Sequence, residues 1–138
     1  MVIYSEGITL QTAAVREYLN ITAQVKATLE KSAFHDGIIV VTSLHSNSAI
    51  IVSDEEPGLL EDMQEWIAKL APTGGQYKHS DPHFESNAGI HLQSLLLHHQ
   101  VIVPFSNGRL DLGPGQFVIF VELDGLRPKR VSLKVIGE

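Results

Sequence analysis

Apolar residues recur along the chain in short segments that have the length and composition of β-strands. The first segment alternates apolar and polar residues, the next two are continuous β-branched runs that favour strands buried on both faces, and three more lie near the end. These segments are 2–10, 37–44, 49–52, 101–105, 116–123 and 131–136. The pairs Asn107-Gly108 and Asp124-Gly125 are strong turn formers between the last three segments, so we predict a β meander there.

Three other segments repeat their apolar residues at the spacing of an α-helix. Thr22 can cap a first helix that runs to about residue 32, Pro57 opens a second, and Asn87 can cap a third that runs to about residue 99. The repeating apolar residues are Leu59, Leu60, Met63, Trp66, Ile67 and Leu70 on the second helix and Leu92, Leu95 and Leu96 on the third, where we expect them to face inward. Residues 71–86 lack periodicity and predict a long loop. Together these elements indicate an α+β fold.

Composition and charge narrow the class of protein. The chain has 138 residues, 43% hydrophobic and 19% charged, which fits one soluble domain spanning residues 1–138. A formal charge of −6 disfavours nucleic acid, because phosphate backbones bind electropositive surfaces. The chain has no cysteine, so any metal would need imidazole, carboxylate or amide ligands. We find no signal peptide and no apolar segment long enough to cross a bilayer, so we expect a cytoplasmic protein with no membrane partner.

Histidine is the residue type that points to chemistry. There are seven, and five fall between residues 79 and 99. His45 lies in a polar segment between two predicted strands, where it either lines a site at a strand end or only caps a turn. From periodicity alone, His91 belongs to a polar stripe of the third helix that is as well explained by contact with solvent. Imidazole both binds metals and carries protons near neutral pH.

A metal site is one interpretation of these histidines. His79 and His83 are four residues apart, but Pro82 argues against the helix that would bring them together. His45, His79 and His91 could instead converge from separate elements as the three ligands of a catalytic zinc. The alternative is that all three are surface residues. Glu122 follows an apolar run, so it is either a buried acid or base or an ordinary carboxylate at a strand end.

The order and spacing of these segments resemble the YjbQ-like family, often labelled secondary thiamine-phosphate synthase, over nearly the whole chain. The segments that carry the resemblance are LHSNSAIIVSDE, LLEDMQEW, YKHSD, NAGIHLQSLLL, VPFSNGRLDLG and VELDGLRPKRVSLKVIGE, with a glutamine at position 116. Three positions depart from the family pattern: Gly115 replaces a tryptophan, Ser53-Asp54 replaces Asn-Glu, and His98 replaces a glycine. The missing indole removes a large stacking surface.

The resemblance implies an antiparallel, sandwich-like β-sheet core with packed helices, assembled as a homotrimer with pockets near the subunit contacts. It also implies a weak transferase activity, in which a pyrimidine methyl diphosphate and a thiazole phosphate give thiamine phosphate and pyrophosphate. A divalent metal, zinc or magnesium, would be expected to neutralise the diphosphate.

The resemblance assigns roles to particular residues of one pocket. It implies catalytic roles for His45, His91, Glu122, Gln116 and Asp62, substrate contacts from Arg127, Asn87 and Ser46, and metal ligation by His45, His79 and His91. Glu122 would orient an imidazole or a metal-bound water, and Asp62 would orient a histidine from behind. Gln116 would hydrogen-bond the substrate and Arg127 would grip a phosphate. The alternatives are a non-catalytic trimer that binds a metal or a small phosphorylated metabolite, and an interaction module with surface histidines.

Overall fold

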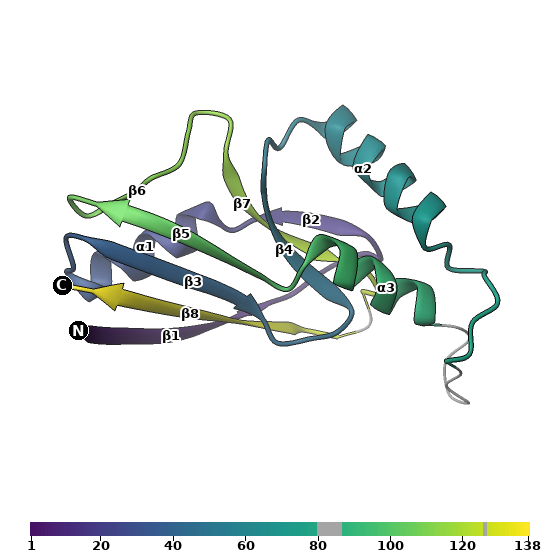
Figure 1. Ribbon diagram of the computed structural model, residues 1–138, viewed down its shortest axis with the longest axis horizontal. Helices are drawn as coiled ribbons and strands as arrows, with labels where there is room; N and C mark the ends of the chain where they lie inside the picture. Colours follow the sequence, from purple (N-terminus) through teal and green to yellow (C-terminus); the bar gives the residue numbers. More distant parts are fainter. Residues whose placement is uncertain (80–86, 126) are drawn as a thin grey trace.

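The computed structural model describes residues 1–79, 87–125 and 127–138. The helices and strands of this part of the chain are labelled in Figure 1. They are β1 (Val2–Leu10), β2 (Glu17–Asn20), α1 (Thr22–Ser32), β3 (Gly37–Ser43), β4 (Ser48–Ser53), α2 (Pro57–Leu70), α3 (Ala88–Leu97), β5 (Gln100–Ser106), β6 (Arg109–Leu110), β7 (Phe117–Glu122) and β8 (Lys129–Gly137). Among these residues no helix is both long enough and apolar enough to span a membrane.

The strands form two antiparallel sheets. A five-stranded sheet has the order β1-β8-β3-β5-β6, and a three-stranded sheet has the order β2-β7-β4. Strands that follow one another in the chain mostly lie in different sheets, as β3 and β4 do, and the pair β5 and β6 is the exception. The α+β fold with an antiparallel, sandwich-like core is confirmed.

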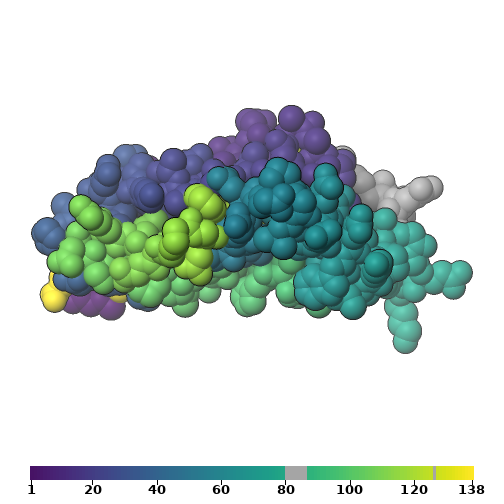
Figure 2. All heavy atoms as spheres, turned by 90° about the horizontal axis from the view of Figure 1, so that it is seen from above, coloured from purple at the N-terminus to yellow at the C-terminus, as the bar shows by residue number. Residues whose placement is uncertain are grey.

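Two hydrophobic cores hold the layers together. The larger core lies between the sheets, where Val41 of β3 and Phe120 of β7 are fully buried and α1 contributes Val25. The smaller core lies on the other side of β7, where Val121 packs with Ile67 of α2 and α3 adds partly buried residues. Figure 2 shows α2, in teal, on the outside of the molecule. The three-stranded sheet is thus covered on both faces, and the five-stranded sheet packs one face on it.

The predicted meander is wrong. The turn expected at Asn107-Gly108 is present, with both residues at positive φ, but it joins β5 to the short strand β6 and not to β7. β7 then pairs with β2 and β4 in the other sheet, and β8 returns to the five-stranded sheet between β1 and β3. β7 and β8 thus lie in different sheets although they follow one another in the chain, and the hydrophobic pattern does not reveal this. The short strands β2 and β6 were not predicted either.

The starts of the helices also differ in part from the prediction. Pro57 does open α2, and the carboxylate of Glu56 caps that helix by accepting from the backbone N–H groups of two following residues. Neither Thr22 nor Asn87 caps a helix with its side chain. The Thr22 hydroxyl is buried and instead accepts a hydrogen bond, at 2.9 Å, from the backbone N–H of Val118 in β7.

The leucines of α3 do not face inward, contrary to the prediction. Leu92, Leu95 and Leu96 are 40%, 75% and 51% exposed, whereas Gln93 and Ser94 of the same helix are buried. The Gln93 amide donates to the carbonyl of Ala71, and the Ser94 hydroxyl donates to the carbonyl of Ser48. These two hydrogen bonds fix the polar face of α3 against the fold, so the apolar face is left outward. α2 behaves similarly, with Ile67 buried and Trp66 56% exposed.

Candidate functional site

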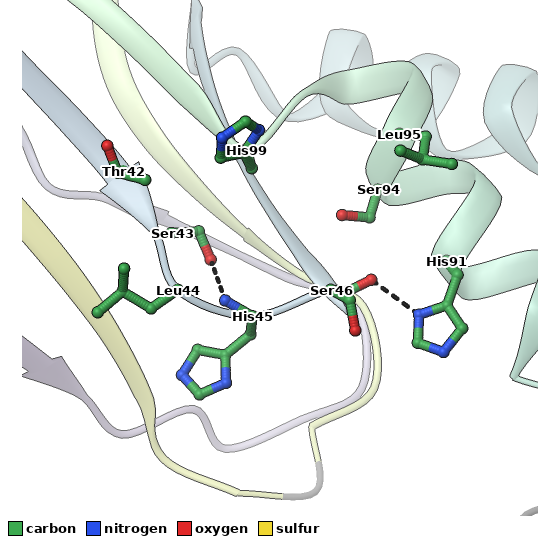
Figure 3. Close-up of a pocket in the computed structure, with 9 residues that line it drawn as sticks. All are labelled: Thr42, Ser43, Leu44, His45, Ser46, His91, Ser94, Leu95 and His99. Atoms are coloured by element: carbon green, nitrogen blue, oxygen red, sulfur yellow. Dashed lines mark hydrogen bonds between the residues drawn. The ribbon is translucent and has the colours of Figure 1, made fainter.

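A pocket of about 530 Å³ opens where β3 ends beside α3. Its lining residues, drawn in Figure 3, are Thr42, Ser43, Leu44, His45, Ser46, His91, Ser94, Leu95 and His99. Two of the predicted histidines, His45 and His91, therefore line one pocket together with the predicted substrate contact Ser46. His99 lines it as well and was not predicted as a site residue. Its place just after a helix, in a His-His pair, is the only sequence signal that could have indicated it.

His45 sits directly after β3, and its ring takes part in the pairing with β8. The backbone N–H of Leu44 donates to the carbonyl of Arg130, and the backbone N–H of Arg130 donates to Nε2 of His45 at 2.9 Å. The imidazole thus accepts a hydrogen bond at the position where the next backbone carbonyl of a strand would. This bond fixes the direction of the ring at the pocket wall.

The surroundings of His45 keep its ring uncharged. Burial lowers the pKa of His45 below its usual range, and the positive charges of Lys129 and Arg127 lower it further. The carboxylates of Glu122 and Asp124 act in the opposite direction with smaller effect. The neutral imidazole is therefore the dominant form at neutral pH.

His91 projects from α3 on the other side of Ser46 (Figure 3). Its Nδ1 lies 2.9 Å from the backbone carbonyl of Ser46. A carbonyl only accepts hydrogen bonds, so Nδ1 carries the proton and Nε2 keeps its lone pair. His79 lies beside it, with ring centroids 5.3 Å apart in an edge-to-face arrangement, and its Nε2 is 2.8 Å from the side-chain oxygen of Asn87. Asn87 therefore orients His79 rather than capping α3.

A buried ionic cluster lies behind His45. The ammonium of Lys129 is 3.0 Å from the Glu122 carboxylate and 2.6 Å from that of Asp124, and Lys129 and Glu122 are fully buried. The Thr12 hydroxyl also donates to Glu122, at 2.6 Å, and the Asn47 amide donates to Asp124. Glu122 is thus held in an ion pair, and the structure shows no hydrogen bond between it and either pocket histidine.

The remaining predicted site residues are spread over the molecule. Gln116 precedes β7 and does not line the pocket, and its side-chain oxygen accepts from the backbone N–H of Gly113. The pocket lies at the other end of β7, roughly 17 Å away for a strand of this length. Asp62 is exposed on α2 and does not line the pocket. Arg127 is exposed but close enough for its charge to act on His45. His83 lies outside the described residues.

A three-histidine metal site does not fit this geometry. Among residues 1–79, 87–125 and 127–138, no group of three or more histidine and acidic side chains is arranged to hold a metal ion. Nε2 of His45 already accepts from Arg130, so that nitrogen would have to give up its hydrogen bond to bind a metal. Of these three histidines, His79 and His91 are the two whose imidazoles lie side by side.

His98 stands at the junction of α3 and β5 with an unusual backbone. Its φ of 77° and ψ of 154° lie in a region that glycine occupies readily and other residues do not. The ring offsets part of this strain, because its Nδ1 accepts from the backbone N–H of His99 and it stacks on the His99 ring at 4.7 Å. The glycine expected here from the family pattern matches this backbone.

Comparisons with known proteins agree with this fold. The family model described as UPF0047 protein YjbQ-like matches residues 6–138. A UPF0047 protein of Archaeoglobus fulgidus is 40% identical over 129 residues, which make up 94% of this chain and 98% of that protein. The crystal structure of a YbjQ-like protein from Sulfolobus solfataricus superposes with a TM-score of 0.92 at 32% identity, and 99% of each chain is covered. A hypothetical protein from Aeropyrum pernix gives a TM-score of 0.89 at 33% identity, covering 98% of this chain and 99% of its own. The resemblance seen in the sequence motifs is confirmed, and the chain belongs to the YjbQ-like UPF0047 family.

Proposed function

We propose that the pocket between His45 and His91 binds a small phosphorylated metabolite. The observation that carries this proposal is the pair of imidazoles on either side of Ser46, each fixed by one backbone hydrogen bond and each with its second ring nitrogen left for a ligand. The positive charge of Arg127 acts on the same place. A fixed donor beside a cation is the usual means of holding a phosphate, and the acceptor nitrogen of His91 suits the hydroxyl of a singly ionised phosphate.

The reaction we propose is the formation of thiamine phosphate at a low rate. The thiazole nitrogen attacks the methylene carbon of the pyrimidine, the new C–N bond replaces the C–O bond to the diphosphate, and pyrophosphate leaves. The charge that develops on the leaving oxygen needs fixed donors and cations, which the Nδ1–H of His45 and the guanidinium of Arg127 can supply. No step is assigned to a metal, since the three-histidine set does not fit.

The test of this reaction is turnover by purified protein supplied with the two precursors, with and without Mg²⁺. We expect thiamine phosphate to form and His45→Ala to lower the rate about 100-fold, as loss of a fixed transition-state donor does. His91→Ala should lower the rate as well, because it removes the acceptor nitrogen that would orient the substrate. His35→Ala is the matched control, because His35 is exposed and does not line the pocket. Equal rates in all four proteins, or no product from any, would rule the reaction out.

Binding without turnover is a second candidate, and the placement of Gln116 favours it. This predicted substrate contact lies at the far end of β7, and Asp62 lies on the outer helix, so one chain alone lacks two of the expected contacts. Gly115 is open to solvent, with a carboxylate oxygen of Asp54 the nearest atom at 3.7 Å to the place of a side chain. Calorimetric binding of a precursor without product formation would select this candidate.

We also propose that the chain assembles as a homotrimer through the outer face of its five-stranded sheet. The apolar residues of this open face are Ile3, Ile38, Val40, Ile102, Pro104 and Ile136, and Ser5 and Lys134 lie in the same row as Val40 and Ile102. Ile3 and Ile102 are 50% and 58% exposed. Contiguous exposed apolar surface of this kind marks an interaction site. Thr42, the next position of β3 on this face, lines the histidine pocket, so a neighbouring copy would extend over its mouth.

A divalent metal stays a prediction, restricted to His79 and His91. Their imidazoles are adjacent, and Nε2 of His91 keeps its lone pair. Two imidazoles would leave the other coordination positions to water or to ligand phosphate oxygens. Metal analysis of purified protein and of His91→Ala tests this prediction, and equal metal content in both would contradict it.

A further inference from the structure

We infer that His45 serves the pocket as a hydrogen-bond donor, through an Nδ1–H that binds an oxygen of an anionic ligand, and that it is not a metal ligand. The inference deepens the proposed function, because it rests on the pocket being a phosphate site and says which atom of His45 the phosphate meets.

The first step is the identity of the partner at Nε2. A backbone N–H donates and has no lone pair, so the 2.9 Å bond from Arg130 requires that Nε2 of His45 carry no proton. A doubly protonated ring would place two donors against each other at this distance. The ring is therefore neutral, and its single proton is on Nδ1.

The second step is that strand pairing holds the backbone of Arg130 in place. Arg130 belongs to β8, where it pairs with Thr9 of β1, and its carbonyl accepts from Leu44 at 3.1 Å. The preceding residue, Lys129, is fully buried and holds two carboxylates. The N–H that faces His45 is consequently anchored on both sides, and the tautomer of His45 is determined by the fold before any ligand arrives.

The third step is what remains for a ligand. Within the described residues Nδ1 of His45 has no hydrogen-bond partner, and neither does Nε2 of His91. The first is a donor and the second an acceptor. A phosphate ester offers both unprotonated oxygens and, when singly ionised, a hydroxyl, so it can satisfy both imidazoles at once. A metal ion would satisfy the acceptor alone.

The tautomer can be measured directly by ¹⁵N NMR of the imidazole rings in the ligand-free protein. We expect a protonated Nδ1 and an unprotonated Nε2 for His45 and the same pattern for His91, whose Nδ1 donates to a carbonyl. A proton on Nε2 of His45 would overturn the inference, whether or not the protein has any activity. This measurement thus separates the inference from the proposed function.

The donor role is tested by two isosteric variants and pyrophosphate as the probe. The amide nitrogen of asparagine lies close to the place of Nδ1, and that of glutamine lies close to the place of Nε2. We expect His45→Asn to bind pyrophosphate within about threefold of wild type and His45→Gln to bind it about tenfold more weakly, a loss of about 1.4 kcal/mol. His35→Asn is the control for a surface substitution.

The zinc content of the same variants tests whether His45 is a metal ligand. We expect zinc uptake to be unchanged in His45→Asn and His45→Gln and reduced in His91→Ala, if wild type takes up zinc. Loss of zinc in both His45 variants would overturn the inference. So would equal pyrophosphate affinity in the two variants, or no affinity in the wild-type protein.

Discussion

Lys129 is the central residue of the buried ionic cluster behind His45. A lysine ammonium is rarely fully buried, and here it is compensated by Glu122 and Asp124, which come from the end of β7 and the turn after it. One cation faces two carboxylates, with Thr12 and Asn47 donating further hydrogen bonds. The cluster joins β8 to β7, and hence one sheet to the other, directly behind His45.

We expect Lys129→Met to destabilise the protein by about 3–5 kcal/mol, because it leaves two buried carboxylates without their cation. The measurement is the midpoint and slope of urea unfolding, followed by circular dichroism. Lys26→Met is the matched control, since Lys26 is an exposed lysine of α1. A loss below 1 kcal/mol for Lys129→Met would show that the cluster contributes little.

Sequence patterns singled out His45 and His91 but not the residues that pack and hydrogen-bond around them. His45 could be singled out because a polar segment interrupts two buried runs, and that placement is confirmed. Lys129 could not, because a lysine between Arg127 and Arg130 is typical of a solvated basic segment. Its burial depends on carboxylates that only the crossing between the sheets brings near. The catalytic and metal roles themselves stay predictions.

At the scale of elements, the junction between α3 and β5 is the strained point of the fold. His98 there combines a glycine-like backbone with a ring that bonds the next backbone N–H. The backbone must turn sharply at this place because the carbonyls of His98 and His99 accept from Ile50 of β4 and Ser43 of β3 respectively. The junction thus ties both sheets to α3 beside the pocket.

We expect His98→Gly to be more stable than His98→Ala by about 1–3 kcal/mol, the range of strain relieved when glycine takes such a backbone. Both variants lack the imidazole, so their difference isolates the backbone, and thermal and urea unfolding measure it. If His98→Ala were as stable as His98→Gly, the strain at this position would be absent.

Elements were predicted well where their cause is local and poorly where it is not. The helix opened by Pro57 and the turn at Asn107-Gly108 follow from backbone preferences within a few residues, and both are confirmed. The partner of β7 depends on a strand far away in the chain. The orientation of α3 depends on two polar side chains that bind distant carbonyls, so the leucine pattern alone predicts the wrong face.

At the scale of the whole molecule, apolar surface is distributed unevenly. The open face carries isoleucine and valine on neighbouring strands, in register across β3, β5 and β8. For example, Val40 pairs with Ile102, and Ile38 with both Pro104 and Ile136. Contact between water and these apolar side chains is unfavourable, so covering them with another copy of the chain lowers the free energy.

We expect the wild-type protein to run at three times the mass of one chain in light scattering after gel filtration. Ile102→Lys should shift it to the monomer, because it places a second positive charge in the row that already holds Lys134. Leu59→Lys, at a residue of α2 that is 43% exposed, is the control and should leave the assembly unchanged. A monomeric wild-type protein, or a trimer that survives Ile102→Lys, would contradict the assignment of this face.

The position of β8 has a consequence for how the chain acquires its structure during synthesis. β8, residues Lys129–Gly137, lies between β1 and β3 and supplies hydrogen bonds to both. Until these residues have left the ribosome, β1 has no partner and β3 is paired on one edge only. β1 and β3 therefore keep unpaired edges until β8 is available. Folds of this kind form slowly, because the strands that must pair are far apart in the sequence. A nascent chain that ends before β8 would be a ready substrate for chaperones that bind exposed strands.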